Sequence, residues 1–197
     1  MTIQSKKLLV GLTGGIACGK STALGILGQL GWQTISTDAI VADLLQNDYS
    51  LKKALKTKWG PRVFDDDEIN KKKISEIIFN DQEARTWLEN LLHPLVREIW
   101  KKEVVNSEEK NVVVEIPLLF EKKLEHLFQI TVCVQCEKKT QLKRLFDRGL
   151  TKAQSNARID AQLPMGQKSQ LADIVLLGEN SLSFLKRQIC IFHARVT

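Results

Sequence analysis

Long apolar runs and aromatic residues are both scarce in this sequence. No apolar run approaches the roughly 18 residues that a membrane-spanning helix needs, so we expect no membrane partner. The short polar start leads directly into an apolar segment and leaves no room for a signal peptide, which predicts a cytoplasmic protein. Aromatic residues make up only 6% of the chain and form no basic, aromatic stripe, so nucleic acid is not expected as a partner despite the net charge of +6.

Cysteines are also few, and their pattern does not predict a metal site. Cys133 and Cys136 have the spacing of a redox motif or of half a zinc site, but no second pair completes a tetrahedral site. Cys133 lies between two valines in a strand-like run, so we interpret this pair as ordinary half-buried thiols. Free thiols are typical of proteins in a reducing compartment.

A glycine-rich segment, Gly14-x-x-x-x-Gly19-Lys20-Ser21, joins an apolar run at Leu8–Leu12 to a helical pattern that stops at Gly31. Small residues let backbone N–H groups approach phosphate oxygens, and the following helix adds the positive end of its dipole. Lys20 can reach the β- and γ-phosphates of a nucleotide, and the Ser21 hydroxyl can ligate Mg²⁺. The segment therefore predicts a phosphate loop. The expected ATP-binding residues are Gly14, Gly15, Ile16, Ala17, Cys18, Gly19, Lys20, Ser21 and Thr22.

Short apolar segments, most of them followed by helical patterns, predict an α/β protein with a parallel sheet. The expected strands are 8–13, 32–35, 112–116, 129–134 and 173–177. In such sheets ligands bind outside the carboxyl ends of the strands, where Asp38 and Glu115 would lie. With Ser21, either carboxylate is a candidate Mg²⁺ ligand, although Asp38 could equally be a helix N-cap.

The stretch 49–105, between the second and third strands, reads as an all-helical insertion around a polar loop at 63–69. Asn80 and Glu83 resemble a capping box at the start of a long helix, and Pro94 predicts a kink there or two abutting helices.

His93 and Arg97 lie one turn apart on that long helix, and on spacing alone a structural role for the histidine is favoured. Arg144 and Arg148 have the i, i+4 spacing that predicts one helix face, which suits either a lid over phosphates or a solvated basic surface. Glu121 follows an expected loop that enters a short helix, and it either faces substrate or is an exposed charge.

Several stretches, taken together and in order, resemble the dephospho-CoA kinase family. They cover nearly the whole chain. They are Gly11–Thr22, the region of Asp38, Ile78-Phe79, Leu92–Arg97, Pro117–Glu121, Gln141–Arg148, Arg158–Gln162 and Ala172-Asp173. The chain departs from the family pattern in four places: Ala17-Cys18 in the loop, Arg148-Gly149 after the expected lid helix, Gly178 in place of a common asparagine, and Lys71 in place of a frequent arginine.

The resemblance implies transfer of the ATP γ-phosphate to the ribose 3′-hydroxyl of dephospho-CoA, the last step of CoA biosynthesis. It also implies a P-loop NTPase fold of the nucleotide-monophosphate-kinase type, with five parallel strands flanked by helices. A single domain, 1–197, would then contain a helical CoA-binding insertion at 49–105 and a lid at 144–166.

The resemblance also implies site roles. Asp38 would orient or deprotonate the acceptor hydroxyl, with Lys20, Arg144 and Arg148 as further catalytic residues. The substrate-binding residues would be Asp38, His93, Arg97, Leu118 and Glu121. Mg²⁺ would accompany ATP.

Two other functions remain open on the residues alone. One is a kinase of another small nucleotide or nucleoside, which would share the loop and the lid. The other is a nucleotide-dependent switch or nucleic-acid-associated ATPase, which the basic charge allows. We expect small-molecule partners only, and a monomer or a weak homo-oligomer.

Overall fold

The computed structural model describes residues 7–179 and 181–197, and the chain divides into two compact units. The first unit combines the residues up to Ser36 with Ser107–Thr197, and the second is Thr37–Asn106. Across the described ranges, none of the helices combines the length and the apolar character that a membrane crossing requires.

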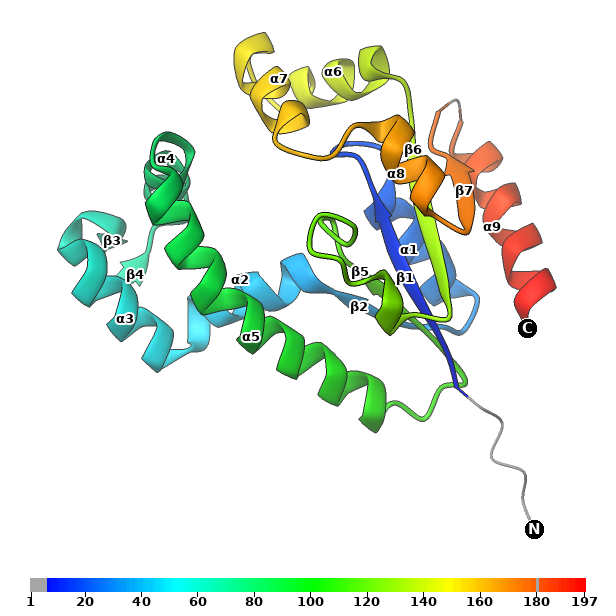
Figure 1. Cartoon of the computed structure of the whole chain (residues 1–197), viewed down its shortest axis with the longest axis horizontal. Coiled ribbons are helices and arrows are strands. Elements are labelled where there is room, and N and C mark those ends of the chain that lie inside the picture. Colours follow the sequence, from blue (N-terminus) through cyan, green and yellow to red (C-terminus); the bar gives the residue numbers. More distant parts are fainter. Residues whose placement is uncertain (1–6, 180) are drawn as a thin grey trace. The chain divides into compact units, whose positions relative to one another are not determined.

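A parallel sheet of five strands forms the centre of the first unit in its described residues, in the order β2-β5-β1-β6-β7 (Figure 1). The strands are β1 (Leu8–Gly14), β2 (Gln33–Ser36), β5 (Asn111–Glu115), β6 (Ile130–Gln135) and β7 (Ile174–Leu177). Their expected positions are confirmed to within one residue at each end. Because β1 lies between β5 and β6, its carboxyl end is a switch point where an open α/β sheet binds ligands.

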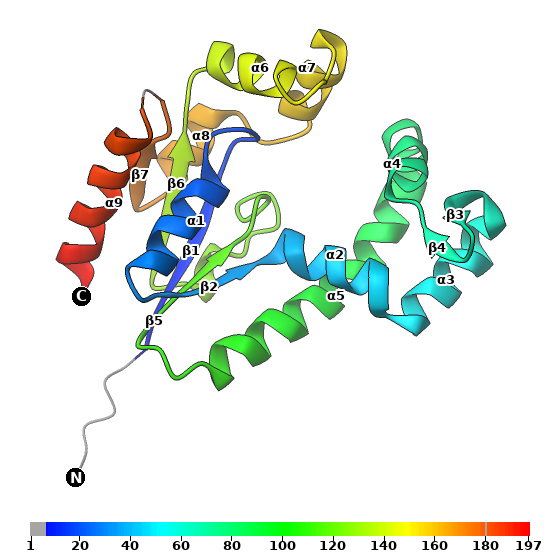
Figure 2. The same ribbon diagram turned by 180° about the vertical axis from the view of Figure 1, so that it is seen from behind.

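Helices cover both faces of this sheet. α1 (Lys20–Gln29) and α9 (Leu182–Val196) pack together on one face, as Figure 2 shows, and α8 (Met165–Leu171) packs on the other against β6 and β1. α6 (Lys138–Phe146) and α7 (Lys152–Asp160) lie beyond the carboxyl ends of β1 and β6 (Figure 2). The sheet therefore presents its ligand-binding edge to these two helices.

The apolar core explains why the strands form. Val112, Val113 and Val114 of β5 are fully buried, as expected for a continuous apolar run covered on both faces. On the α1 side, the rings of Trp32 and Phe192 lie 5.8 Å apart, and Trp32 Nε1 donates a hydrogen bond of 3.0 Å to His193 Nδ1. These contacts join α9 to the start of β2.

Two local expectations for the first unit are wrong. The segment after β5 does not enter a helix: residues 117–123 form successive turns, followed by the 3₁₀ turn η2 (Glu125–Leu127). α6 ends at Phe146, so Arg148 lies in the turn beyond it and does not share a helix face with Arg144. Gly149, the residue after Arg148, has φ +83°, a left-handed conformation that glycine adopts easily and that ends the turn.

The second unit is helical with one small hairpin. Its elements are α2 (Thr37–Asn47), α3 (Tyr49–Trp59), the 3₁₀ turn η1 (Gly60–Val63), β3 (Phe64–Asp65), β4 (Glu68–Ile69), α4 (Lys71–Asn80) and α5 (Gln82–Asn106). Leu51, Leu55 and Val63 are buried at its centre, and the rings of Trp59 and Trp87 meet edge to face with centroids 5.1 Å apart.

Three expectations for this unit differ from the structure. The polar loop at 63–69 contains the antiparallel β3–β4 hairpin, whose tight turn uses positive φ at Asp66 and Asp67. Asp81, not Asn80, caps α5, because its Oδ1 accepts from the N–H groups of Glu83 and Ala84. α5 also continues through Pro94 as one helix, so the alternative of two abutting helices is wrong.

Candidate active site

The phosphate-loop segment lies between the last residue of β1, Gly14, and the first residue of α1, Lys20. Gly14 has φ +143°, and a Cβ there would lie 2.1 Å from the carbonyl oxygen of Val134. Gly19, the N-cap of α1, has φ +103°. Both positions therefore need glycine. The helix that follows has no acidic residue in its first turn, so its positive N-terminal dipole is not neutralised there. Such an N-terminus favours an anion.

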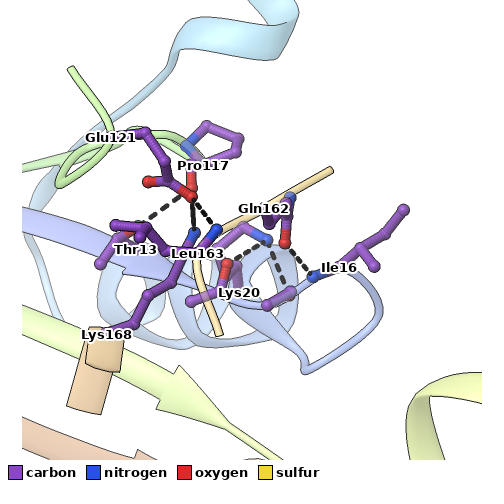
Figure 3. A network of polar contacts seen from close by, with 10 residues as sticks. Thr13, Ile16, Lys20, Pro117, Glu121, Gln162, Leu163 and Lys168 are labelled. Atoms are coloured by element: carbon purple, nitrogen blue, oxygen red, sulfur yellow. Dashed lines mark hydrogen bonds and ion pairs between the residues drawn. The ribbon is translucent and has the colours of Figure 1, made fainter. Parts of the chain in front are cut away.

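The Lys20 side chain folds back over this loop. Its ammonium lies 3.3 Å from the carbonyl oxygen of Gly14 and 3.0 Å from that of Gly15, and the residue is only 9% exposed (Figure 3). The backbone therefore fixes one positive charge beside the loop. A cation in this place can neutralise charge on phosphate oxygens that meet the same loop.

Two glutamines and one arginine from beyond β6 hold the loop in place. Gln141 of α6 donates to the Ile16 carbonyl at 2.8 Å, and the Gln162 side chain accepts from the Ile16 N–H at 3.0 Å (Figure 3). Arg144 donates to the carbonyl oxygens of Ala17 at 3.0 Å and Gly178 at 2.7 Å. Arg144, expected on the nucleotide phosphates, thus joins the backbone of the loop at Ala17 to the segment after β7 at Gly178.

The carbonyl contact of Arg144 places the segment after β7 against the phosphate loop. A Cβ at Gly178 would lie 1.8 Å from the carbonyl oxygen of Cys18, so no larger residue fits this backbone. The Gly178 N–H in turn donates to the Gln135 carbonyl at 2.8 Å. In this chain, Gly178 is therefore required by a close approach of two backbones.

A buried ion pair, which the sequence did not indicate, supports the same region. Lys168 of α8 is fully buried; its ammonium lies 2.8 Å from Glu121 Oε1 and donates to the Pro117 carbonyl at 2.8 Å (Figure 3). Glu121 Oε1 also accepts from the Leu163 N–H at 3.0 Å. Glu121 is therefore not the exposed charge that was one of its two expected roles, since its side chain is only 15% exposed.

The ion pair links the turn after β5 to α8, and the bond from Leu163 links the same turn to the chain between α7 and α8. Pro117 also accepts from the Thr13 hydroxyl at 3.2 Å, which ties that turn to β1 next to the loop. A lysine in a short polar helical pattern carries no sequence signal of burial, because lysine is almost always exposed. Only the tertiary contacts reveal this role.

A cavity of about 370 Å³ opens beside the phosphate loop within the first unit. Its wall includes Gly15, Cys136, Gln141, Ile159, Gln162 and Met165. Lys138 and Asp160, which form an exposed ion pair of 3.5 Å, lie at the same cavity. Its volume is in the range of small-molecule sites, and it adjoins the loop that favours an anion.

The other expected site residues are exposed or half-buried, and they belong to both compact units. Asp38 is exposed in the first turn of α2, two residues after β2 ends, so the N-cap alternative does not describe it. His93 and Arg97 are exposed on α5, and Leu118 is half-buried in the turn after β5.

The residues around the loop suit Mg²⁺ better than a softer metal. Ser21 is exposed in the first turn of α1, and Glu115, the last residue of β5, is 4% exposed. The described residues contain no cluster of three or more histidine, cysteine or carboxylate groups that would form a protein cage. Mg²⁺ does not need such a cage, because it takes one or two protein oxygens together with phosphate and water.

Comparison with known proteins shows what this arrangement resembles. The family model described as dephospho-CoA kinase matches residues 8–183. A dephospho-CoA kinase from Trichormus variabilis is 36% identical over 92% of this chain and 94% of its own.

Two solved structures are also similar. A Thermus thermophilus protein has a TM-score of 0.85 at 30% identity, covering 98% of this chain and 99% of that one. A dephospho-CoA kinase from Campylobacter jejuni has a TM-score of 0.65 at 30% identity, covering 97% and 98%. The overall fold is thus similar to that of a solved dephospho-CoA kinase.

Proposed function

We propose a residue-level scheme for this protein on the premise that the chain belongs to the dephospho-CoA kinase family. The protein is an ATP-dependent kinase that phosphorylates dephospho-CoA to form CoA. The two molecules differ by one phosphate on the ribose, so the acceptor atom is the 3′-hydroxyl oxygen. The observation that carries the assignment is the family match over residues 8–183, which includes the phosphate loop and the segments that hold it.

The loop holds the nucleotide in this scheme. Phosphate oxygens are bound by the N-terminus of α1 and by loop N–H groups other than those of Ile16 and Cys18, which already have partners in the protein. The Lys20 ammonium neutralises charge on these oxygens. Gln141, Gln162 and Arg144 keep the loop in shape through their bonds to its backbone. Pre-set donors matter because they need no rearrangement as charge moves in the transition state.

A metal ion would be held by Ser21, with Glu115 or Asp38 binding it directly or through water. ATP-dependent kinases need a divalent metal in general, and Mg²⁺ would supply positive charge on the phosphates when bound. Ser21 and Glu115 offer only oxygen atoms, which Mg²⁺ prefers.

Asp38 steers the acceptor in this scheme. Its carboxylate accepts the hydrogen bond of the 3′-hydroxyl and aligns that oxygen with the γ-phosphorus. His93 and Arg97 bind the substrate from the helical insertion, 49–105, and Leu118 binds it from the turn after β5. Glu121 contributes by fixing that turn through Lys168.

The lid region, 144–166, closes over the phosphates and excludes water. Arg148 is the candidate for direct contact with phosphate, since it is exposed in the turn after α6. Arg144 acts on the loop backbone instead. The bonds of Arg144 to the Ala17 and Gly178 carbonyls support this assignment of separate roles.

An acceptor panel tests the proposal. ADP release is measured with dephospho-CoA and, separately, with shikimate, adenosine, deoxyadenosine and gluconate, and the position of the new phosphate is read by phosphorus NMR. We expect turnover with dephospho-CoA alone and a 3′-phosphate on the product. Faster turnover of another acceptor, or a phosphate at a different oxygen, would contradict the scheme. Gel filtration in the same buffer tests the expected monomer or weak homo-oligomer.

A further inference from the structure

Two cysteines from distant parts of the chain meet at the phosphate loop. Cys18 lies in the loop and Cys136 directly follows β6, and their sulfur atoms are 3.2 Å apart. Cys18 is fully buried, Cys136 is 5% exposed, and neither is in a disulfide. None of the proposed catalytic steps uses either sulfur.

We propose that Cys18 and Cys136 form a reversible disulfide when the protein meets a hydroperoxide, and that this bond switches off nucleotide binding. The inference is independent of the acceptor, because both sulfurs lie beside the loop that holds ATP. The proposed disulfide joins Cys18 to Cys136. It is not the Cys133–Cys136 pair that the sequence spacing indicates.

Strand geometry excludes the pair that the sequence spacing suggests. Cys136 lies just beyond β6 and packs in the core cluster that contains Cys18, whereas Cys133 of β6 is not part of that cluster. The two thiols therefore lie on opposite sides of the strand, as the alternation of side chains along it requires. Cys133 pairs in register with Thr13 and Val175 inside the sheet, and burial raises its pKa to about 11. Cys133 is therefore an inert thiol of the core.

The sulfur of Cys18 is the better nucleophile of the pair. The Cys136 thiol donates its hydrogen bond to that sulfur, which lowers the pKa of Cys18, and the charge of Lys20 acts in the same direction. The same bond, together with burial, raises the pKa of Cys136. Of the two thiols, Cys18 is therefore the one that loses its proton more readily.

A small oxidant has a place to approach. Cys136 and Gly15 both line the cavity beside the loop. A Cβ built on Gly15 would lie 2.8 Å from the Cys18 sulfur, so that sulfur lies immediately behind the cavity wall. A hydroperoxide in the cavity therefore needs only a small opening of the loop to reach Cys18.

The chemistry balances in two steps. Cys18 gives up its proton, and its thiolate attacks the hydroperoxide so that the O–O bond breaks and Cys18 becomes a sulfenic acid. The other oxygen takes up the proton that Cys18 gave up and leaves as water or an alcohol. The Cys136 sulfur then attacks the Cys18 sulfur, the S–O bond breaks, and the hydroxyl leaves as water with the proton of Cys136. The thiols lose two electrons and the hydroperoxide gains them.

Formation of the Cys18–Cys136 disulfide must displace the phosphate loop. A disulfide holds its sulfurs about 2.0 Å apart, so the two atoms must approach by about 1 Å. Cys18 cannot move alone, because its neighbour Ala17 is bound by Arg144 and its own carbonyl contacts the backbone at Gly178. A misplacement of about 1 Å in groups that position a substrate can lower the rate about 100-fold.

The experiment compares the whole enzyme, reduced and peroxide-treated. Peptide mapping without reductant should find a cross-link between the peptides of Cys18 and Cys136. Binding of a fluorescent ADP analogue and kcat/KM for ATP should fall 10- to 100-fold and return with dithiothreitol. Binding of the ADP analogue is measured without an acceptor. The result therefore does not depend on which acceptor the enzyme phosphorylates.

Two variants make the test specific. Cys136→Ser should keep nucleotide binding and activity after peroxide, and Cys190→Ser, which removes a half-buried thiol on α9, should lose both as the wild type does. The proposal is overturned if no cross-link forms, if the cross-linked protein binds nucleotide normally, or if Cys136→Ser is inactivated equally. If Cys136→Ser does not fold, differential labelling of wild-type thiols at sites 18 and 136 decides the same question.

Discussion

The ammonium of Lys20 is held by two carbonyl oxygens of the loop that it crosses, Gly14 and Gly15. A charge held in this way can act on phosphate without a large loss of side-chain entropy, because its position is already fixed. At the scale of single residues, the loop therefore combines one fixed cation with glycines that no other residue can replace.

Lys20→Met should lower kcat/KM for ATP by at least about 100-fold, the usual cost of losing one fixed electrostatic contact in a transition state. The fold should survive, since the lost bonds go to carbonyls at the edge of the loop. Steady-state kinetics and a thermal melt check this. Lys186→Met removes an exposed lysine of α9 and serves as the matched control. Equal kinetics for both variants would remove Lys20 from the scheme.

Gly178→Ala tests the close approach of two backbones. The added Cβ would lie 1.8 Å from the Cys18 carbonyl, so the loop or the segment after β7 must move. We expect a loss of about 1–3 kcal/mol in the free energy of unfolding and weaker nucleotide binding. Chemical denaturation and ADP titration measure these two effects.

Gly166→Ala is the control for that variant, because a Cβ there meets nothing within 4 Å. It lies in α8, so it should be neutral or stabilise by up to about 1 kcal/mol. A Gly178→Ala protein as stable as Gly166→Ala would show that the two segments are not held together as described.

At the scale of elements, an ion pair between Lys168 of α8 and Glu121 holds α8 against the turn after β5. Lys168 pairs with Glu121 Oε1, while the Pro117 carbonyl and the Leu163 N–H supply backbone bonds to the same pair. Among the described residues, Glu121 Oε2 is the one buried side-chain polar atom without a hydrogen bond. Breaking such a pair from one side leaves an uncompensated buried charge.

Lys168→Met should therefore destabilise the protein by about 3–5 kcal/mol, because Glu121 remains charged and buried. The double variant Lys168→Met with Glu121→Leu should recover much of that loss, since both buried charges are gone. Urea denaturation of the two variants gives the comparison. A double variant as unstable as the single one would mean that the ion pair is not the source of the effect.

At the scale of the whole molecule, the proposed reaction needs residues from both compact units. The phosphate loop belongs to the unit built on the parallel sheet, and Asp38, His93 and Arg97 belong to the helical unit, Thr37–Asn106. The chain passes directly from the end of β2 at Ser36 into α2, which carries Asp38. In the proposed scheme, the unit built on the parallel sheet holds ATP and the helical unit supplies the residues that position the acceptor.

Asp38→Asn should lower kcat by about 10²- to 10⁴-fold while the KM for ATP changes little, because the carboxylate acts on the acceptor hydroxyl. Initial rates over a matrix of both substrates separate the two parameters. Asp43→Asn, at an exposed carboxylate of the same helix, should behave as wild type. Near-normal turnover of Asp38→Asn would exclude Asp38 as the group that steers the hydroxyl.

Local chemistry was sufficient to predict the elements and the loop. Apolar runs such as Val112–Val114 specify buried strands wherever they lie, and the glycines at 14 and 19 are required by backbone angles within their own turn. The five strands and the phosphate loop were therefore predictable from residues that are neighbours in the chain. The same local reasoning failed at Arg148 and at the turns of 117–123, where the end of a helix depends on what packs against it.

Contacts between distant segments were decided only by the tertiary structure. Lys168 is buried by a carboxylate 47 positions away, Cys18 meets Cys136 across 118 positions, and Arg144 binds Ala17 across 127. No pattern within a short window encodes such pairs, because each contact depends on a partner that is far away in the chain and reaches it only in the folded protein. The sequence by itself determined a phosphate-binding α/β chain, and the packing of the sheet decided which side chains hold its loop.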